Sequence, residues 1–271
     1  MFKERVISAI VLVILLLGFL IVGNIPLFLA VLALSVIAFF EMTKATKVHT
    51  DKLNGLEIVG VLGCLGYYGT VYFTGLSTYV ILVFILTIAF MMMVYVFSFP
   101  KFHANQITGA IFSFMYAPVM LSFLYLTRQL EGGVYFVWLT FIGSWICDTC
   151  AYLVGVKIGK HKLAPVLSPK KSIEGSVGGI VGAAIVGVIY ALVLTKMQLV
   201  PGKMLWIYPV ITTVCSLFSQ VGDLAASGIK RNHEIKDYGK LIPGHGGVMD
   251  RFDSVIFIAP IIYYLSLLLS R

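Results

Sequence analysis

The sequence predicts an all-α, polytopic membrane protein, and three observations lead to this prediction. First, 59% of the 271 residues are hydrophobic and only 12% are charged, against about 25% charged residues in an ordinary soluble domain. Second, apolar runs of about 20 residues, enough to cross a bilayer as a helix, recur along most of the chain. Third, lysine and arginine gather on one predicted side of the membrane. Helices that are apolar all round must be buried in protein or lipid, which excludes a soluble fold.

Nine candidate transmembrane spans follow one another along the chain. The first is not expected to be a cleavable signal peptide, because its apolar stretch is too long and a second span begins almost at once. No small-residue cleavage site follows it either. The nine spans lie near 6–22, 25–42, 56–75, 77–99, 106–127, 133–155, 176–195, 204–226 and 254–270.

The positive charges predict how the chain is oriented. With the N-terminus in the cytoplasm, sixteen of the 20 lysines and arginines fall inside, and only Arg128, Lys196, Lys203 and Arg271 fall outside. This is the positive-inside bias of membrane proteins. We therefore expect an integral protein of the cytoplasmic (inner) membrane. The net charge of +8 requires no nucleic-acid partner, because this bias and an anionic membrane surface explain it.

The two halves of the chain differ in polar content. Residues 1–130 contain almost no charge within their spans, and Glu41 and Glu57 lie near span ends. We interpret this half as a transmembrane scaffold that could form a lipid groove or a homodimer surface. Residues 131–271 contain the polar groups and are predicted to be the catalytic region, with its site facing the cytoplasm.

Two cysteines form a C-x-x-C pattern at Cys147 and Cys150. Such a pair can bind zinc or work in redox chemistry, but it usually needs a second pair, nearby histidines or a thioredoxin-like context. None accompanies it here. We favour small buried residues on one helix face.

Asp148, in the stretch WICDTCAY, is the first acidic residue well inside a span. It lies about seven residues, or roughly 10 Å, from the cytoplasmic end of its helix. An ionised carboxylate at this depth costs about 2–3 kcal/mol even on lenient scales, so it should face a cavity, a cation or a partner. A structural ion pair with a lysine is the alternative. The loop that follows is basic and leads into a glycine-rich helix start, an arrangement suited to phosphate.

Asp223 stands at the cytoplasmic end of the eighth span, before a long polar segment. Lys230, Arg231, Lys236 and Lys240 concentrate positive charge that suits a polyphosphate. Residues 243–247 (PGHGG) contain too many glycines for a helix and can present consecutive backbone N–H groups to an anion.

Asp250 and Asp253 open the last span three residues apart, on one helical face. Each of these features has a simpler explanation, in which aspartates cap a helix, glycines form a flexible turn and lysines set topology. Together they place four carboxylates at one cytoplasmic edge, amid phosphate-binding groups. Oxygen clusters of this kind suit Mg²⁺, and a second cation is left open. The four expected metal ligands are Asp223, Asp250, Asp148 and Asp253.

The segment 227–253 resembles the signature of phosphatidate cytidylyltransferases, also called CDP-diacylglycerol synthases. The matching pattern is S-x-I-K-R-x4-K-D-x-G-x2-I-P-x-H-G-G-V-x-D-R-F-D, without departure. Upstream, D-T-x-A-Y from Asp148 and the stretch from Gly159 to Gly175 are also similar to the family, with Ser172 where threonine is more usual. So many fixed polar residues make the match specific. The first 130 residues resemble the family only in hydropathy.

The resemblance implies a nucleotidyltransferase of phospholipid biosynthesis that converts CTP and phosphatidate into CDP-diacylglycerol and pyrophosphate, with Mg²⁺. Membrane lipid is then both solvent and substrate. The residues expected to act in catalysis are Asp223, Asp250, Lys230, Arg231, Lys236, His245 and Arg251. Those expected to bind substrate are Ser168, Lys171, Glu174, Gly175, Asp237, Gly246 and Gly247.

Two rival interpretations fit less well. A CDP-alcohol phosphotransferase would carry a D-x-x-D-G-x-x-A-R run, which is missing from the sequence. A transporter would place charged residues near the membrane midplane, often within an internal repeat. Here the carboxylates are predicted at the cytoplasmic edge, and the halves show no convincing repeat.

Overall fold

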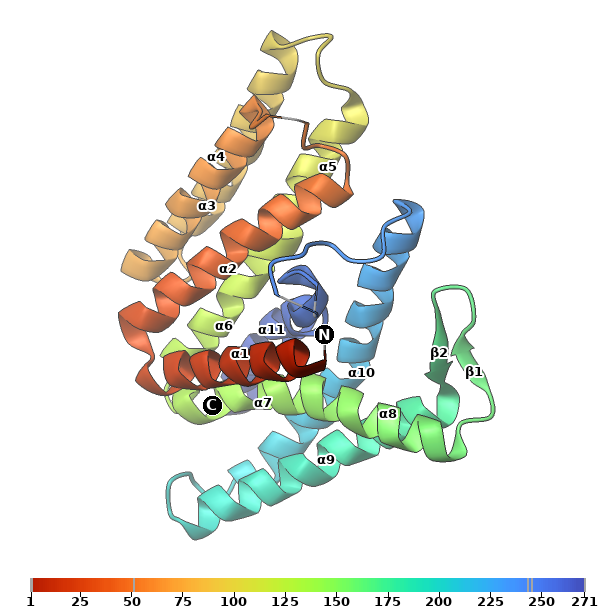
Figure 1. The fold of residues 1–271 in the computed structure, drawn as a ribbon. Helices are drawn as coiled ribbons and strands as arrows, with labels where there is room; N and C mark the ends of the chain where they lie inside the picture. Colours follow the sequence, from red (N-terminus) through yellow and green to blue (C-terminus); the bar gives the residue numbers. More distant parts are fainter. Residues whose placement is uncertain (1, 51, 243, 245, 271) are drawn as a thin grey trace. The chain divides into compact units, whose positions relative to one another are not determined.

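The computed structural model describes residues 2–50, 52–242, 244 and 246–270, with side chains from Val11 onward. The fold is almost entirely helical, as predicted (Figure 1). The helices are α1 (Phe2–Val22), α2 (Asn24–Ala45), α3 (Gly55–Thr74), α4 (Thr78–Phe97), α5 (Ala104–Phe114), α6 (Met120–Gln129), α7 (Gly133–Phe141), α8 (Cys147–Ile158), α9 (Ile173–Lys196), α10 (Met204–Asn232) and α11 (Met249–Ser270). Two π-helical turns, η1 (Met115–Val119) and η2 (Ile142–Ile146), and two strands, β1 (Lys162–Ala164) and β2 (Ser168–Ser172), complete the elements.

Each of the nine expected spans coincides with a helix or with two helices joined by a π-helical turn. Eight stretches of the described chain are long and apolar enough to cross a membrane, and α1 contributes a shorter apolar stretch over Val11–Val22. The chain is therefore an integral membrane protein. Helices dominate because, in lipid, a helix satisfies its own backbone hydrogen bonds.

The π-helical turns interrupt two of the expected spans. Pro118 lies within η1, and proline has no N–H for the regular helical hydrogen bond and crowds the preceding turn. In η2 the turn directly precedes Asp148. Turns of this kind often mark functional positions in helices.

The chain divides into two compact units. Unit 1 comprises Met1–Tyr125 and Asn232–Phe252, and unit 2 comprises Leu126–Arg231 and Asp253–Arg271. The polar segment 232–252 therefore packs with the residues that the sequence assigned to the scaffold. The assignment of a scaffold to residues 1–130 and of a catalytic region to residues 131–271 stays a prediction.

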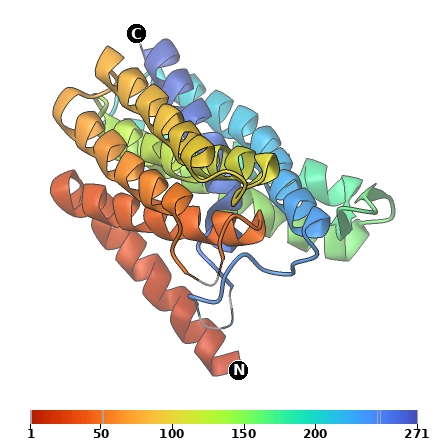
Figure 2. The ribbon, with the colours of Figure 1, turned by 90° about the horizontal axis from the view of Figure 1, so that it is seen from above.

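In unit 1, α3 and α4 lie side by side (Figure 1). Gly63 allows this approach, because a Cβ there would overlap the side chain of Thr87 on α4. Tyr68 is fully buried, and its hydroxyl lies 2.5 Å from Ser35 Oγ and 3.1 Å from the carbonyl oxygen of Pro118. Figure 2 shows α1 leading away from the start of α2 at Gly23, whose φ of 66° favours glycine.

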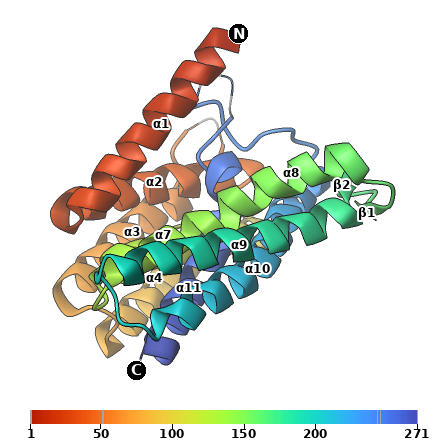
Figure 3. The same cartoon turned by 90° about the horizontal axis from the view of Figure 1, so that it is seen from below.

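In unit 2, α8 and α9 run alongside each other and are joined by the hairpin of β1 and β2 (Figure 3). Gly179 and Gly182 of α9 lie against Cys147 and Cys150 of α8, with no room for a Cβ. Both cysteines are free thiols, and this packing supports their interpretation as small helix-contact residues. The hairpin itself was not expected, since the basic, proline-containing loop shows no clear strand pattern.

Candidate active site

A polar cavity in unit 2 contains several of the expected site residues. The β-hairpin positions Lys171, and α10 positions Asp223, and their side chains form an ion pair. Both side chains remain about a quarter exposed, at 23% and 26%. The cavity has a volume of about 460 Å³, and its polar lining includes Asp148, Lys162, Lys170, Lys171, Ser176, Gln220 and Asp223.

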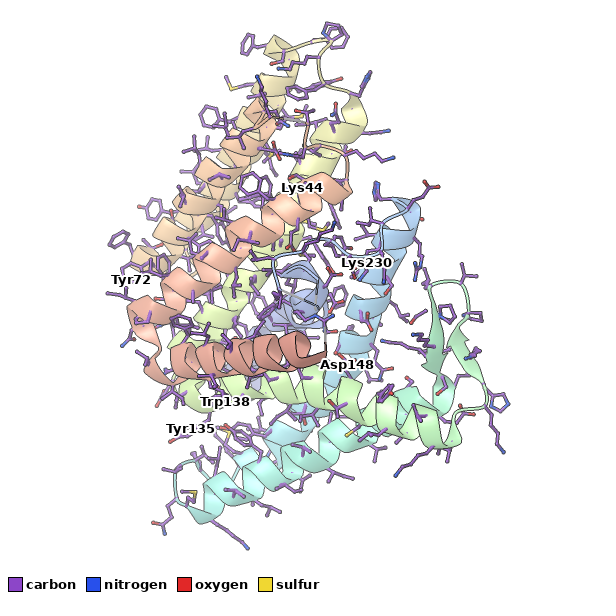
Figure 4. All side chains as sticks on the ribbon, viewed as in Figure 1. Lys44, Tyr72, Tyr135, Trp138, Asp148 and Lys230 are labelled. Carbon is purple, nitrogen blue, oxygen red and sulfur yellow. The ribbon has the colours of Figure 1, made fainter. Side chains whose placement is uncertain are left out.

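Three of the four expected metal ligands belong to unit 2. The charges of Asp223, Asp148 and Lys230 all act on Asp253. Asp253 Oδ1 also accepts a hydrogen bond from its neighbour Ser254 N at 2.7 Å. Figure 4 shows Asp148 on α8 and Lys230 toward the end of α10. Unit 2 thus combines a group of carboxylates with cationic side chains.

The hairpin is held to α9 by a second set of polar contacts. Glu174 accepts hydrogen bonds from the backbone of Lys160 at 3.1 Å and lies 2.6 Å from His161 Nδ1. The Ser172 hydroxyl accepts from Gly175 N at 3.1 Å and caps α9. The hydroxyl shared by serine and threonine therefore has a structural use here. Glu174 and Gly175 shape the hairpin, and their contact with substrate stays a prediction.

In unit 1, Asp250 organises the polar segment by binding its backbone. The side chain is 8% exposed, and Oδ2 accepts from Tyr238 N at 2.8 Å and from Gly247 N at 3.0 Å. Ile242 N donates to Gly246 O at 2.8 Å, which closes the turn. Gly246 has a φ of 87°, a conformation that favours glycine. The Gly247 N–H, expected to face substrate, is thus engaged by Asp250 in this structure.

Glu41 of α2 takes part in the same arrangement, although the motifs predict no role for it. Its carboxylate accepts from Val248 N at 3.0 Å and from Met249 N at 2.8 Å, more than 200 residues along the chain. The signal that could have found it is the one used for Asp148, a carboxylate within an apolar span. The first half of the chain therefore contributes directly to the polar segment.

A second cavity lies on the surface of this segment. Its lining includes four exposed charged side chains, three of them cationic: Lys236, Asp237, Lys240 and Arg251. Ile242 lines this cavity and also an apolar groove of about 460 Å³. The groove is formed by α1 and α2 together with Leu124, Leu241, Val248 and Phe252. Cationic and apolar surfaces thus meet within unit 1.

The described part of the chain contains no group of three or more His, Cys, Asp or Glu side chains that could hold a metal ion. The chemistry of the carboxylates in unit 2 nevertheless fits Mg²⁺, which prefers oxygen donors and often takes only one or two protein carboxylates. Asp223 meets this requirement with an exposed edge, although Lys171 pairs with it here. Magnesium binding stays a prediction.

Comparison with known proteins covers nearly the whole chain. Residues 3–269 match the sequence model described as the cytidylyltransferase family. The chain belongs to this family.

Three relatives are each named phosphatidate cytidylyltransferase. The protein from Staphylococcus saprophyticus is 33% identical over 264 residues, 96% of this chain and 97% of the relative. That from Staphylococcus aureus (strain COL) is 34% identical over 268 residues, again 96% and 97%. The protein from Bacillus subtilis (strain 168) is 31% identical over 272 residues, 99% and 98%.

Membership of the cytidylyltransferase family confirms the resemblance read from the motifs and extends it to the first 130 residues. The chain is therefore a nucleotidyltransferase, and the phosphotransferase and transporter alternatives are rejected.

The structure distributes the expected site residues of this cytidylyltransferase between its two units. In unit 2, Asp148, Lys171, Gly175 and Asp223 line one cavity. In unit 1, Lys236, Asp237, Gly246 and Arg251 line another. Arg231 is exposed at the end of α10, and Ser168 pairs with Ala164 in the hairpin. His245 lies outside the described residues.

Proposed function

We propose that this cytidylyltransferase transfers CMP from CTP to phosphatidate and releases pyrophosphate. The observation that carries the proposal is the near full-length match to proteins of that name, at 31–34% identity. A phosphate oxygen of phosphatidate forms a bond to the α-phosphorus of CTP, while the bond from that phosphorus to pyrophosphate breaks. The attacking phosphate is already anionic near neutral pH. Catalysis then depends on positioning two anions and neutralising charge on the leaving group.

In unit 2 we assign the metal and the nucleotide phosphates to the cavity that contains the Lys171–Asp223 ion pair. Asp223 would hold Mg²⁺, with Asp148 and Asp253 completing or orienting its surroundings. When bound, the ion would neutralise charge on the phosphates. Lys171, released from Asp223, would then contact a phosphate, and Lys230 and Arg231 would add positive charge. About a quarter of the Asp223 side chain is exposed, which supports this exchange of partners.

In unit 1 we assign the lipid substrate to the cationic cavity and the adjoining groove. Lys236 and Arg251 would bind the phosphate of phosphatidate, and Asp237 would orient a neighbouring lysine. The apolar groove, which shares Ile242 with that cavity, would receive an acyl chain. A ligand with an anionic head and an apolar tail matches this pair of surfaces.

The reaction is tested with purified protein in detergent, phosphatidate, CTP and Mg²⁺. We expect pyrophosphate release that requires both substrates, with CDP-diacylglycerol as the lipid product. Release that is unchanged when phosphatidate is omitted, or when diacylglycerol replaces it, would contradict the proposal. Omission of Mg²⁺ tests the metal requirement in the same assay.

We also propose that the site faces the cytoplasm, as the positive-inside bias indicates. A Glu234→Cys protein should react with an impermeant maleimide only in inverted vesicles, and Glu131→Cys only in right-side-out vesicles. Both positions are exposed, and labelling of the unsubstituted protein serves as the background. Labelling of both variants in the same vesicles would contradict this orientation.

A homodimer through the first half stays a prediction. α4 is apolar and largely unburied, with Val96 62% and Phe97 83% exposed, so either lipid or a second copy could cover it. Cross-linking at α4 in native membranes measures which one does.

A further inference from the structure

We propose that Glu41 is a positioning residue of the active site. Its buried carboxylate on α2 fixes the backbone that enters α11, and through that backbone it sets the position of Asp250 and Arg251. The proposed reaction serves here only as the readout. If the unsubstituted protein does not turn over CTP and phosphatidate, the proposed function is contradicted. If the protein turns over equally fast with and without the Glu41 carboxylate, this inference is contradicted.

The first argument is the hydrogen bonding of the helix start. The first N–H groups of a helix have no partner within the helix, and the positive end of the helix dipole favours an anion there. Glu41 meets this need with two charge-assisted bonds, from Val248 N at 3.0 Å and Met249 N at 2.8 Å. Its side chain is only 6% exposed, so little water competes for the carboxylate.

The second argument is steric and independent of the first. A Cβ built on Gly239 or on Gly247 would overlap Glu41 Oε1. The polar segment therefore passes the carboxylate on two sides, at positions where a side chain would force the Glu41 carboxylate to shift. A helix cap alone would not require this fit along two stretches of backbone.

The third argument is the choice of capping residue. Helices are usually capped by the polar side chain of the residue just before them, but Val248 precedes α11 and has none. The cap comes instead from a residue 207 positions away from Val248. Burying a carboxylate in a span is expensive, and a local serine would cap the helix at lower cost. What Glu41 adds is a fixed position for the segment relative to α2.

That position bears on the candidate site through adjacent residues. Gly247 N, next to the first Glu41 contact, donates to Asp250 Oδ2 at 3.0 Å. Asp250 follows Met249 directly, and Arg251 lines the cationic cavity. Glu41 and Asp250 therefore hold the same turn of backbone through neighbouring N–H groups. A shift of either carboxylate would move this backbone and, with it, the Arg251 side chain that lines the cationic cavity.

The principal test compares Glu41→Gln with Glu57→Gln in the purified full-length protein. Both glutamates are buried in unit 1, and Glu57 accepts from Thr43 at 3.0 Å and from Asn54 N at 3.2 Å. We expect Glu41→Gln to lower kcat about tenfold or more, while KM for CTP changes less than about threefold. Glu57→Gln should lose thermal stability without such a loss of kcat. Glu41→Asp should restore part of the activity.

If both Gln variants lose kcat equally and in proportion to their lost stability, the role of Glu41 is merely structural and the proposal is wrong.

A double-substitution cycle tests the steric argument and remains informative if Glu41→Gln folds poorly. Gly239→Ala should lower kcat in the unsubstituted protein, because the new methyl group displaces the Glu41 carboxylate. In the Glu41→Ala background, which leaves space for that methyl, Gly239→Ala should cause little further loss. Gly69→Ala, at a position with open space around it, is the matched control. Additive losses at positions 41 and 239 would overturn the proposal.

Discussion

The acidic residues of the two units use their oxygens in different ways. In unit 2, Asp223 pairs with the side chain of Lys171, and both remain partly exposed. In unit 1, Glu41 and Asp250 are at most 8% exposed and bind four backbone N–H groups between them. A side-chain ion pair can exchange its partner for a ligand, whereas a carboxylate that holds backbone cannot do so without moving the chain. We infer that unit 2 offers both carboxylates and cations to ligand, whereas the carboxylates of unit 1 hold backbone and leave its cations to face ligand.

The largest effect should come from Asp223. Asp223→Asn removes the carboxylate assigned to Mg²⁺, and we expect activity to fall about 100-fold or more. The melting temperature should change little, because a partly exposed ion pair contributes about 0–1 kcal/mol. Activity is measured across Mg²⁺ concentrations, with Glu131→Gln as the exposed-carboxylate control. Wild-type activity at every Mg²⁺ concentration would refute the assignment.

Asp250→Asn should give a smaller loss of activity, about 10–100-fold, but a larger loss of stability. The asparagine NH₂ group would face backbone donors from Tyr238 and Gly247 if it took the place of Oδ2. Leaving buried donors unpaired costs about 1–3 kcal/mol. Thermal unfolding of this variant beside Asp223→Asn tests the contrast between the units directly. If Asp223→Asn proved the less stable of the two, the contrast would be wrong.

Removing a cation from unit 2 and removing one from unit 1 should each affect the KM of a different substrate. Lys171→Ala is expected to raise KM for CTP about tenfold, and Lys236→Ala to raise KM for phosphatidate by a similar factor. Each variant should leave the KM of the other substrate within about threefold. Steady-state kinetics with each substrate varied in turn gives both values. A rise in the same KM for both variants would remove the division of substrates between units.

The smallest effect concerns the apolar groove. Ala33, which lines it, can be replaced by phenylalanine to fill part of its volume. We expect about a threefold rise in KM for long-chain phosphatidate and no change for a short-chain analogue, because only the long chain would occupy the groove. Leu82→Phe on the exposed surface of α4 is the control. Equal effects on both lipids would argue against an acyl site.

The fold was largely predictable because lipid leaves few choices. Apolar runs long enough to span a bilayer must be helices, and each expected span coincides with helical structure. The sequence does not predict the hairpin at β1 and β2, since its five-residue second strand contains a proline and four polar side chains. The π-helical turns were missed too, because they depend on local packing.

For the site, the sequence predicts candidate residues but not the contacts between them. The signature around 227–253 indicates which charged groups to consider, since their types and spacing are visible in one segment, and their roles stay predictions. The sequence does not predict the pairing of Lys171 with Asp223; it offers an ion pair with lysine only as an alternative for Asp148. Contacts between distant segments leave no periodic pattern in a single sequence. Glu41 does carry a signal, a carboxylate within an apolar span, but its partners near residue 248 cannot be read from the sequence.

The close fit of Gly239 and Gly247 around Glu41 has a consequence for how this family can diverge. The three positions share one volume, so we expect a change at one to be accompanied by a change at another. We expect relatives with a side chain at the position of Gly239 to carry a shorter residue at that of Glu41. A relative that keeps glutamate there should keep both glycines. The packing of one carboxylate would thus appear as linked substitutions some 200 residues apart.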